Sequence, residues 1–323
     1  MVKKFLCLLL WGVFLLLTGC GQQSIAADEG YEVTDSQGSV IKLPQKPQRI
    51  VTLSMGTDEI MLGLVEPERL AAVNELLDDP VSSNVTALAA KIPAKLGEPS
   101  AEAIAALHPD LLVIPDWGNA EQVESFRQLG IPVVVCKGGR NLQEIKETIR
   151  LLAAAAGEKE RGEILISKMD NKLAEITTKT EKIPPEKRKK VVLLSLMAGY
   201  GGKGSAFDEA CRLAGVINGR AEAGIEDGRI MSKEQFAAIN PDIIFLPTYN
   251  NHGTVDINKI RQEYLDDPAL QGMKAIQNHA FAEPREAYLY NNSQDFVFAV
   301  QEIAYVVYGE EFYLPSGCHL SAY

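Results

Sequence analysis

The chain has 323 residues, of which 46% are apolar and 23% are charged, and its formal net charge is −11. This length and apolar content favour two globular domains and exclude a disordered chain. The acidic balance argues against nucleic acid as a partner, because such proteins carry a basic surface.

The first thirty residues have the pattern of an export and anchoring segment. Two lysines precede an apolar run over residues 5–17, and Leu-Thr-Gly stands directly before Cys20. The run is shorter than the roughly 20 residues of a membrane-spanning helix, so residues 1–19 are interpreted as a cleaved signal peptide. Leu-Thr-Gly-Cys resembles the bacterial lipoprotein signal, which implies acylation of Cys20 and a lipidated tether over residues 20–30. Loss of the signal removes two lysines and no acid, and the net charge then changes from −11 to −13.

Residues 31–156 alternate short apolar runs with helical periodicity, which predicts an N-terminal α/β lobe. In chain order we expect a peripheral hairpin over residues 31–43, a strand over 49–54, a helix through 60–64, a strand over 70–73, an irregular binding loop over 74–99, a helix over 121–129, a strand over 132–136 and a helix over 141–156.

A long helix is predicted between the lobes, within residues 157–186. Leu165, Met169, Leu173 and Ile176 recur at helical spacing on one face. A helix over residues 158–180 would span about 35 Å, comparable to a small domain. It is either an ordinary surface helix or a rigid strut that joins two lobes.

A C-terminal α/β lobe is predicted over residues 187–309. We expect a strand over 191–196, a glycine-rich turn over 199–204, a helix over 206–214, a loop over 219–229, a helical segment over 256–264, a short strand over 280–282 and a final helix over 293–308. The C-terminal tail, residues 310–323, has no periodicity and receives no prediction.

One segment occurs twice. Residues 100–115 and 232–247 share Ser, Glu, Ala-Ala, Pro-Asp and a final Pro at a constant offset of 132 residues. That offset is too long for a solenoid repeat, whose period is about 20–50 residues. It therefore predicts two similar lobes.

Each copy predicts a capped helix that leads into a buried strand. Ser100 and Ser232 cap the helices, and Glu102 and Glu234 lie in the first turns, where the helix dipole favours a carboxylate. The apolar runs that follow predict parallel strands buried on both faces. Because ligands bind beyond the carboxyl ends of such strands, the glutamates and the following aromatic loops are expected beside one ring-lined crevice.

Residues 199–204 match G-x-G-x-x-G between a predicted strand and a predicted helix. No second strand that ends in an acid follows at the distance of a dinucleotide fingerprint. The Walker pattern fails, because Gly204 follows Lys203. The glycines are therefore interpreted as a loop that lets the backbone approach a ligand closely. No nucleophile elbow, H-E-x-x-H or kinase motif occurs.

Histidine and cysteine patterns give no metal-ligand spacing. Of the four histidines, His252 follows Tyr249-Asn-Asn in a predicted loop. It is either a solvated loop residue or an axial ligand to the metal of a bound macrocycle. Cys136 and Cys211 are expected to be buried and inert.

Aromatic residues on predicted loops are the positive signal for a ligand. Together they suit a large, flat, partly apolar molecule, and two cations are candidates at the same rim. The aromatic residues are Trp117, Tyr200, Tyr249, Tyr288 and Tyr290, and the cations are Lys203 and Arg285.

Four features carry a resemblance to a known family: Cys20, the Arg-Ile-Val-Thr-Leu-Ser run over residues 49–54, the repeated blocks and the long helix. With them, residues 47–308 resemble the substrate-binding proteins of ABC importers for iron-siderophores, haem and cobalamin. The resemblance implies two Rossmann-like lobes with parallel sheets, joined by one long helix, with ligand in the cleft between them. It also implies that Glu102 and Glu234 dock on the permease. Ser54 and Met55 join the candidate ligand-binding residues.

The leading hypothesis is a non-enzymatic monomer, lipid-anchored on the extracytoplasmic side of the cell membrane. It would capture a ferric-siderophore, haem or cobalamin-type ligand and deliver it to the permease and ATPase complex, without a resident cofactor or metal. The alternative is an exported α/β enzyme or a tetrapyrrole or metal chaperone, with His252 and Asp116 or Glu283 as its titratable pair. A zinc or manganese receptor is not supported by the histidine spacing.

Overall fold

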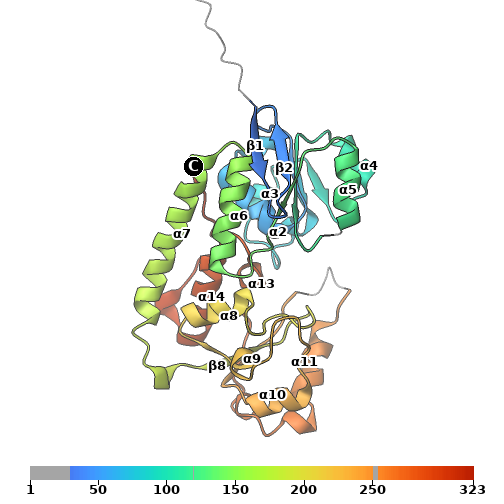
Figure 1. Cartoon of the computed structure of the whole chain (residues 1–323). Coiled ribbons are helices and arrows are strands. Elements are labelled where there is room, and N and C mark those ends of the chain that lie inside the picture. Colours follow the sequence, from blue (N-terminus) through green and yellow to red (C-terminus); the bar gives the residue numbers. More distant parts are fainter. Residues whose placement is uncertain (1–29, 119, 250–253) are drawn as a thin grey trace, which may run out of the picture.

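The computed structural model describes residues 30–118, 120–249 and 254–323, which form two α/β lobes (Figure 1). Each lobe is built on one parallel sheet, and helix α7 (Lys159–Thr180) runs along the side of the molecule beside both lobes. The predicted fold class is therefore confirmed. The predicted signal peptide, Cys20 and most of the tether lie outside the described residues.

The N-terminal lobe holds a five-stranded parallel sheet in the order β5-β4-β3-β6-β7. All five residues of β6 are buried, as its continuous apolar run predicts. The predicted hairpin is also confirmed, as the antiparallel pair β1–β2. The strands are β1 (Tyr31–Thr34), β2 (Val40–Leu43), β3 (Ile50–Thr52), β4 (Leu70–Asn74), β5 (Ala94–Leu96), β6 (Leu111–Pro115) and β7 (Val133–Cys136).

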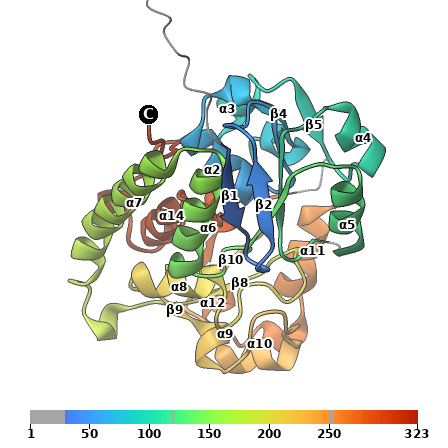
Figure 2. The same cartoon turned by 45° about the horizontal axis from the view of Figure 1, so that its top comes forward.

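Helices on both faces of this sheet keep it from water (Figure 2). The stretch predicted as one irregular loop instead holds η2, α3 and β5. These elements are three or four residues long, too short to leave a readable periodicity. The helices are α2 (Met55–Leu64), η1 (Pro67–Arg69), η2 (Glu75–Asp78), α3 (Thr86–Ala89), α4 (Ala101–Ala106), α5 (Ala120–Gln128) and α6 (Leu142–Ala155).

The C-terminal lobe holds a four-stranded parallel sheet in the order β11-β10-β8-β9. Its strands are β8 (Lys190–Leu193), β9 (Ile217–Asn218), β10 (Ile243–Phe245) and β11 (Phe281–Ala282). Its helices are η3 (Pro185–Lys187), α8 (Ala206–Leu213), α9 (Gly219–Glu222), α10 (Lys233–Ile239), α11 (Ile257–Leu265), η4 (Pro268–Leu270), α12 (Lys274–Gln277), α13 (Glu286–Leu289), α14 (Phe296–Tyr308) and η5 (Glu310–Phe312).

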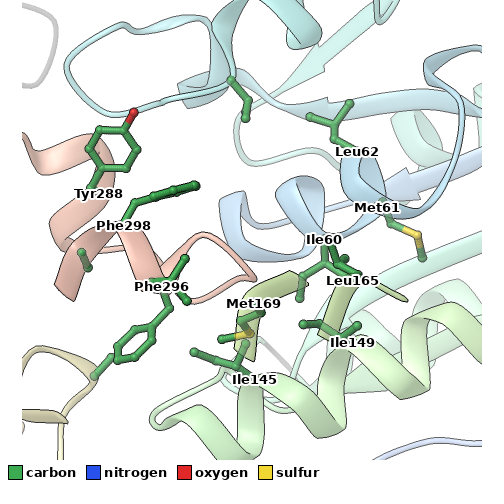
Figure 3. Packing of buried hydrophobic residues seen from close by; sticks show 14 of the residues in the cluster. Ile60, Met61, Leu62, Ile145, Ile149, Leu165, Met169, Tyr288, Phe296 and Phe298 are labelled. Atoms are coloured by element: carbon green, nitrogen blue, oxygen red, sulfur yellow. The ribbon is translucent and has the colours of Figure 1, made fainter. Parts of the chain in front are cut away.

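One buried apolar cluster, here called the shared core, extends from one sheet to the other. It runs from Ile50 in β3 through α2, α6, α7 and α14 to Phe245 in β10. Figure 3 shows its middle, where Met169 of α7 lies between Ile145 of α6 and Phe296 of α14. The long helix is thus packed into the protein along its apolar face. This favours the strut over the ordinary surface helix.

The C-terminal tail returns from the C-terminal lobe to the N-terminal lobe. The backbone N–H of Leu320 donates to the Asp295 carboxylate at 2.8 Å, beside α14. Two residues later, the N–H of Ala322 donates to the carbonyl of Gly63 in α2, also at 2.8 Å. Figure 1 accordingly places the C-terminus at the end of α7 that adjoins the N-terminal lobe. The tail therefore ties the two lobes together.

Candidate functional site

The duplicated segment forms the same local structure in both lobes. Ser100 begins α4 and Ser232 begins α10, and each side-chain oxygen accepts the N–H three residues on, at 3.2 Å. Glu102 and Glu234 lie in the first turns and are exposed. The predicted caps and first-turn carboxylates are confirmed.

Hydrogen bonds hold both glutamates in the ionised form. The pKa of Glu102 is lowered by its own backbone N–H and by the Ser100 hydroxyl, and the pKa of Glu234 is lowered by the Ser232 hydroxyl and its own N–H. Figures 1 and 2 show α4 on the flank of one lobe and α10 at the far end of the other. Neither glutamate lines the cavity between the lobes, and their expected position beside it stays a prediction.

The repeated Pro-Asp has a role that the sequence analysis missed. The Asp110 carboxylate accepts from the backbone N–H groups of Gln48 at 2.6 Å and Arg49 at 2.8 Å, just before β3. Asp242 accepts from the N–H of Lys190, at the start of β8, at 2.9 Å. In each lobe the aspartate before one strand thus fixes the start of its parallel neighbour. Its placement directly before an apolar run was the available signal.

The glycine-rich turn packs against protein backbone. A Cβ on Gly202 would lie 2.5 Å from the carbonyl oxygen of Glu226, and one on Gly199 would lie 2.7 Å from the backbone of Gly228. The buried Arg220 side chain donates to the carbonyl of Gly199 at 3.0 Å. Gly199 and Gly202 are therefore needed for a close approach between two loops of the C-terminal lobe, and the approach of this turn to a ligand stays a prediction.

A cavity of about 260 Å³ lies between the lobes and is mainly apolar. The N-terminal lobe contributes the first turns of α2, together with η2 and Ser82. The C-terminal lobe contributes the segments that follow β8 and β10, α13 and the turn before α14. The lining residues are Met55, Gly56, Glu59, Leu76, Ser82, Leu196, Met197, Tyr249, Glu286, Ala287, Tyr290, Asn291 and Asn292.

Two of the predicted aromatic residues, Tyr249 and Tyr290, line this cavity. The Tyr290 hydroxyl is 2.8 Å from the Ser195 hydroxyl, and the Tyr290 ring packs on the Tyr200 ring with centroids 4.9 Å apart. Burial raises the pKa of Tyr290 and of Tyr200, so both phenols stay neutral. Tyr200 does not line the cavity and supports Tyr290 from behind.

Two carboxyl groups reach the cavity. Glu286 accepts from the backbone N–H groups of Thr248 and Tyr249, and so fixes the loop that carries the tyrosine. Glu59 is 2% exposed and accepts from the Asn291 amide at 2.6 Å. Burial, reinforced by the charge of Asp295, raises the pKa of Glu59 well above its usual value. This raised pKa favours the neutral acid form of Glu59, which lines the cavity.

Met55 lines the cavity as predicted, whereas Ser54 caps α2 instead, accepting from the N–H of Thr57. Trp117 is 70% exposed and lies against Gly138. The neighbouring Gly139 approaches the backbone of Asn292, a lining residue, but Trp117 itself is not among the described lining residues.

The remaining predicted residues lie elsewhere. Tyr288 is 1% exposed and belongs to the shared core, so its predicted place at the rim is wrong. Arg285 is paired with the Glu302 carboxylate behind α13. Lys203 pairs with Glu226 at 3.2 Å and does not line the cavity. His252 lies outside the described residues.

Neither a membrane span nor a metal cluster is found in the described parts of the chain. No helix there is long and apolar enough to cross a bilayer. No three His, Cys, Asp or Glu side chains in those parts gather as metal ligands. Cys136 and Cys211 are buried free thiols, as predicted.

The two lobes, the helix that packs on both and the cavity between them define a binding protein of the bilobed class. A family model described as periplasmic binding protein matches residues 50–287. The chain therefore belongs to the periplasmic binding protein family, whose members serve ABC importers as substrate-binding components. This membership implies an extracytoplasmic location.

Solved structures share the fold at low sequence identity. The periplasmic haem-binding protein RhuT from Roseiflexus sp. RS-1 has a TM-score of 0.68 at 23% identity, covering 81% of this chain and 98% of its own. The haem-binding protein HmuT has a TM-score of 0.69 at 23% identity, and the match covers 88% of this chain and 92% of HmuT. The molybdate-binding protein MolA from Haemophilus influenzae has a TM-score of 0.69 at 19% identity, and the match covers 86% of this chain and 91% of MolA. Among curated proteins, none has a significant sequence match to this chain.

Proposed function

We propose that this chain captures a metal chelate of the haem, corrinoid or ferric-siderophore type and delivers it to the permease of an ABC importer. The observation that carries the proposal is the cavity between the lobes, lined by Met55, Leu76, Met197, Tyr249 and Tyr290. Such a lining binds a partly apolar ligand by contact area with few polar anchors. The protein acts by binding and handing over, without turnover.

The fold alone does not select the ligand, because similar structures bind haem and molybdate. A hard oxyanion needs convergent cations or several N–H donors, whereas this lining is mainly apolar. We therefore favour a chelate over an oxyanion. Titration calorimetry with haem, cobalamin, a ferric trihydroxamate and molybdate tests this choice. One-to-one binding of a chelate is expected, and binding of molybdate alone would overturn the proposal.

The enzyme alternative has little support in the described residues. Asp116 lies 3.8 Å from the Arg140 guanidinium, and Glu283 lies 2.8 Å from the Arg261 guanidinium. Neither carboxylate lines the cavity. An acid–base pair must stand within reach of the reacting atoms, and its other expected member, His252, lies outside the described residues.

We propose that Glu102 and Glu234 dock the two lobes on permease arginines. Both carboxylates are exposed, ionised and placed on separate lobes, which suits two charge-assisted contacts. The test is uptake of the radiolabelled ligand by cells that carry the native permease. Combined Glu102→Arg and Glu234→Arg substitutions should abolish uptake and leave ligand affinity unchanged. Reversal of the exposed Glu124 and Glu263 is the matched control, and uptake that survives the first pair would refute the assignment.

We propose further that Cys20 carries the lipid anchor. The pattern before it supports cleavage and acylation. Incorporation of labelled palmitate into the membrane fraction should be lost in Cys20→Ser. Labelling that persists in that variant would contradict the proposal.

A further inference from the structure

The cavity lining has an unusual balance of charge for a site that binds metal chelates. Among the described residues that line it, Glu59 and Glu286 carry carboxyl groups, and none is Lys, Arg or His. Many metal chelates carry carboxylates of their own. A lining without cations has nothing to pair with them.

Further carboxylates stand around the same cavity. Burial raises the pKa of Tyr249, and the negative charges of Asp79, Glu286 and Glu75 raise it further. Glu75 begins η2, the same short helix that carries the lining residue Leu76. The tyrosine at the cavity is therefore surrounded by negative charge from both lobes.

Four described cations on the segments around the cavity are paired with acids. Arg140, beside the Trp117 loop, lies 3.6 Å from Glu144 and 3.8 Å from Asp116. On the other lobe, Arg261 pairs with Glu283 at 2.8 Å. Arg285 pairs in the same way with Glu302, and Lys203 with Glu226. By sequence, residues 250–253 contain no Lys or Arg, and His252 is their one basic side chain.

An anion that enters such a cavity loses its hydration without gaining a counter-charge from the described lining, and it meets the negative charge that Asp79, Glu286 and Glu75 place around Tyr249. A cation is attracted by the same negative charge, and two tyrosines, Tyr249 and Tyr290, line the cavity that it enters. A neutral apolar molecule avoids the repulsion altogether. The cavity therefore discriminates by the sign of the ligand's charge.

We infer that this cavity selects chelates without net negative charge, that is, neutral or cationic complexes with a large apolar surface. The inference rests on the proposed function and deepens it by naming the charge class of the ligand. Carboxylate-rich ferric complexes are excluded, and complexes that carry an ammonium group or an uncharged ligand shell are accepted.

The test uses three ferric trihydroxamates with the same metal-binding shell and a different pendant group. The pendant is an ammonium, an acetamide or a carboxylate, which makes the complex cationic, neutral or anionic. Binding to the chain that begins at residue 30 is followed by titration calorimetry and by quenching of Trp117 fluorescence. The cationic and neutral complexes should bind at least about tenfold more tightly than the anionic one. Added salt should weaken binding of the cationic complex and strengthen binding of the anionic complex.

A substitution within the cavity tests the same dependence of binding on the charge of the ligand. Met197 lines it and is 59% exposed, so a longer polar side chain is accommodated there. Met197→Lys should shift the ratio of anion affinity to cation affinity about tenfold toward the anion. Met197→Gln is the control, with a shift below about twofold.

The outcomes separate the inference from the function on which it rests. Equal or tighter binding of the anionic complex, or an unchanged ratio in Met197→Lys, overturns the charge selection and leaves the chelate-binding function intact. Failure of all three complexes, of haem and of cobalamin to bind overturns the chelate-binding function and the charge selection together.

Discussion

Met169 gives the sharpest test of the shared core. It is fully buried in α7, between α6 of one lobe and α14 of the other. Met169→Ala removes three heavy side-chain atoms, which at about 0.8 kcal/mol each amounts to about 2.5 kcal/mol of lost burial. The remaining cavity adds to this, so the free energy of unfolding should fall by about 2–5 kcal/mol. Urea titrations followed by circular dichroism measure the change.

The stronger expectation concerns cooperativity. Because one apolar cluster reaches both sheets, Met169→Ala should shift a single transition, and hydrogen exchange should show β6 and β10 opening together. Ile164→Ala is the matched control, since Ile164 lies on the same helix and is 45% exposed; its change should stay within about 0.5 kcal/mol. Two transitions, of which only one responds to Met169→Ala, would refute the shared core as a cooperative unit.

Three further predictions follow from buried or cavity side chains. Burial raises the pKa of Asp58 to about 8, so its contribution to stability is present at acidic pH and is lost as the pH rises from about 4 through about 8. The urea midpoints at pH 5 and pH 8 should therefore differ less in Asp58→Asn than in the unmodified protein. An equal difference in the two proteins would contradict this. His319→Ala removes the imidazole that lies 2.7 Å from the buried Asp295 carboxylate. The free energy of unfolding should fall by about 3 kcal/mol, and a loss below about 0.5 kcal/mol would disprove the pairing. Tyr249→Ala should weaken binding of the chelate by at least about fivefold in calorimetry, and unchanged affinity would remove the tyrosine from the site.

The sequence predicted the elements whose signals are local. The serine caps, the first-turn glutamates and the buried strands of the repeat depend on neighbours three or four residues away. The shared core was also partly readable, because Leu165 and Met169 recur on one helical face. The fold class followed from these signals and from the spacing of the two copies.

The composition of the site was harder to predict, because it depends on distant partners. Glu59 follows Thr57 and Asp58 in a run that looks like a solvated face, yet all three are buried. Its amide partner, Asn291, is 232 positions away. Tyr288 and Tyr290 are two residues apart, and only the second faces the cavity. A four-residue helix leaves no periodicity that could separate them.

The C-terminal tail and the shared core both bear on how this binding protein releases its ligand. A wide hinge motion would expose apolar side chains that α7 and α14 now keep dry, and it would break the bonds that the last residues make to α2. The shared core and the bound tail therefore oppose a wide separation of the lobes, and the cavity between them is already formed without a ligand. If the lobes dock through α4 and α10, as proposed, the transporter would contact the flank of one lobe and the far end of the other and could act on each lobe separately (Figure 1).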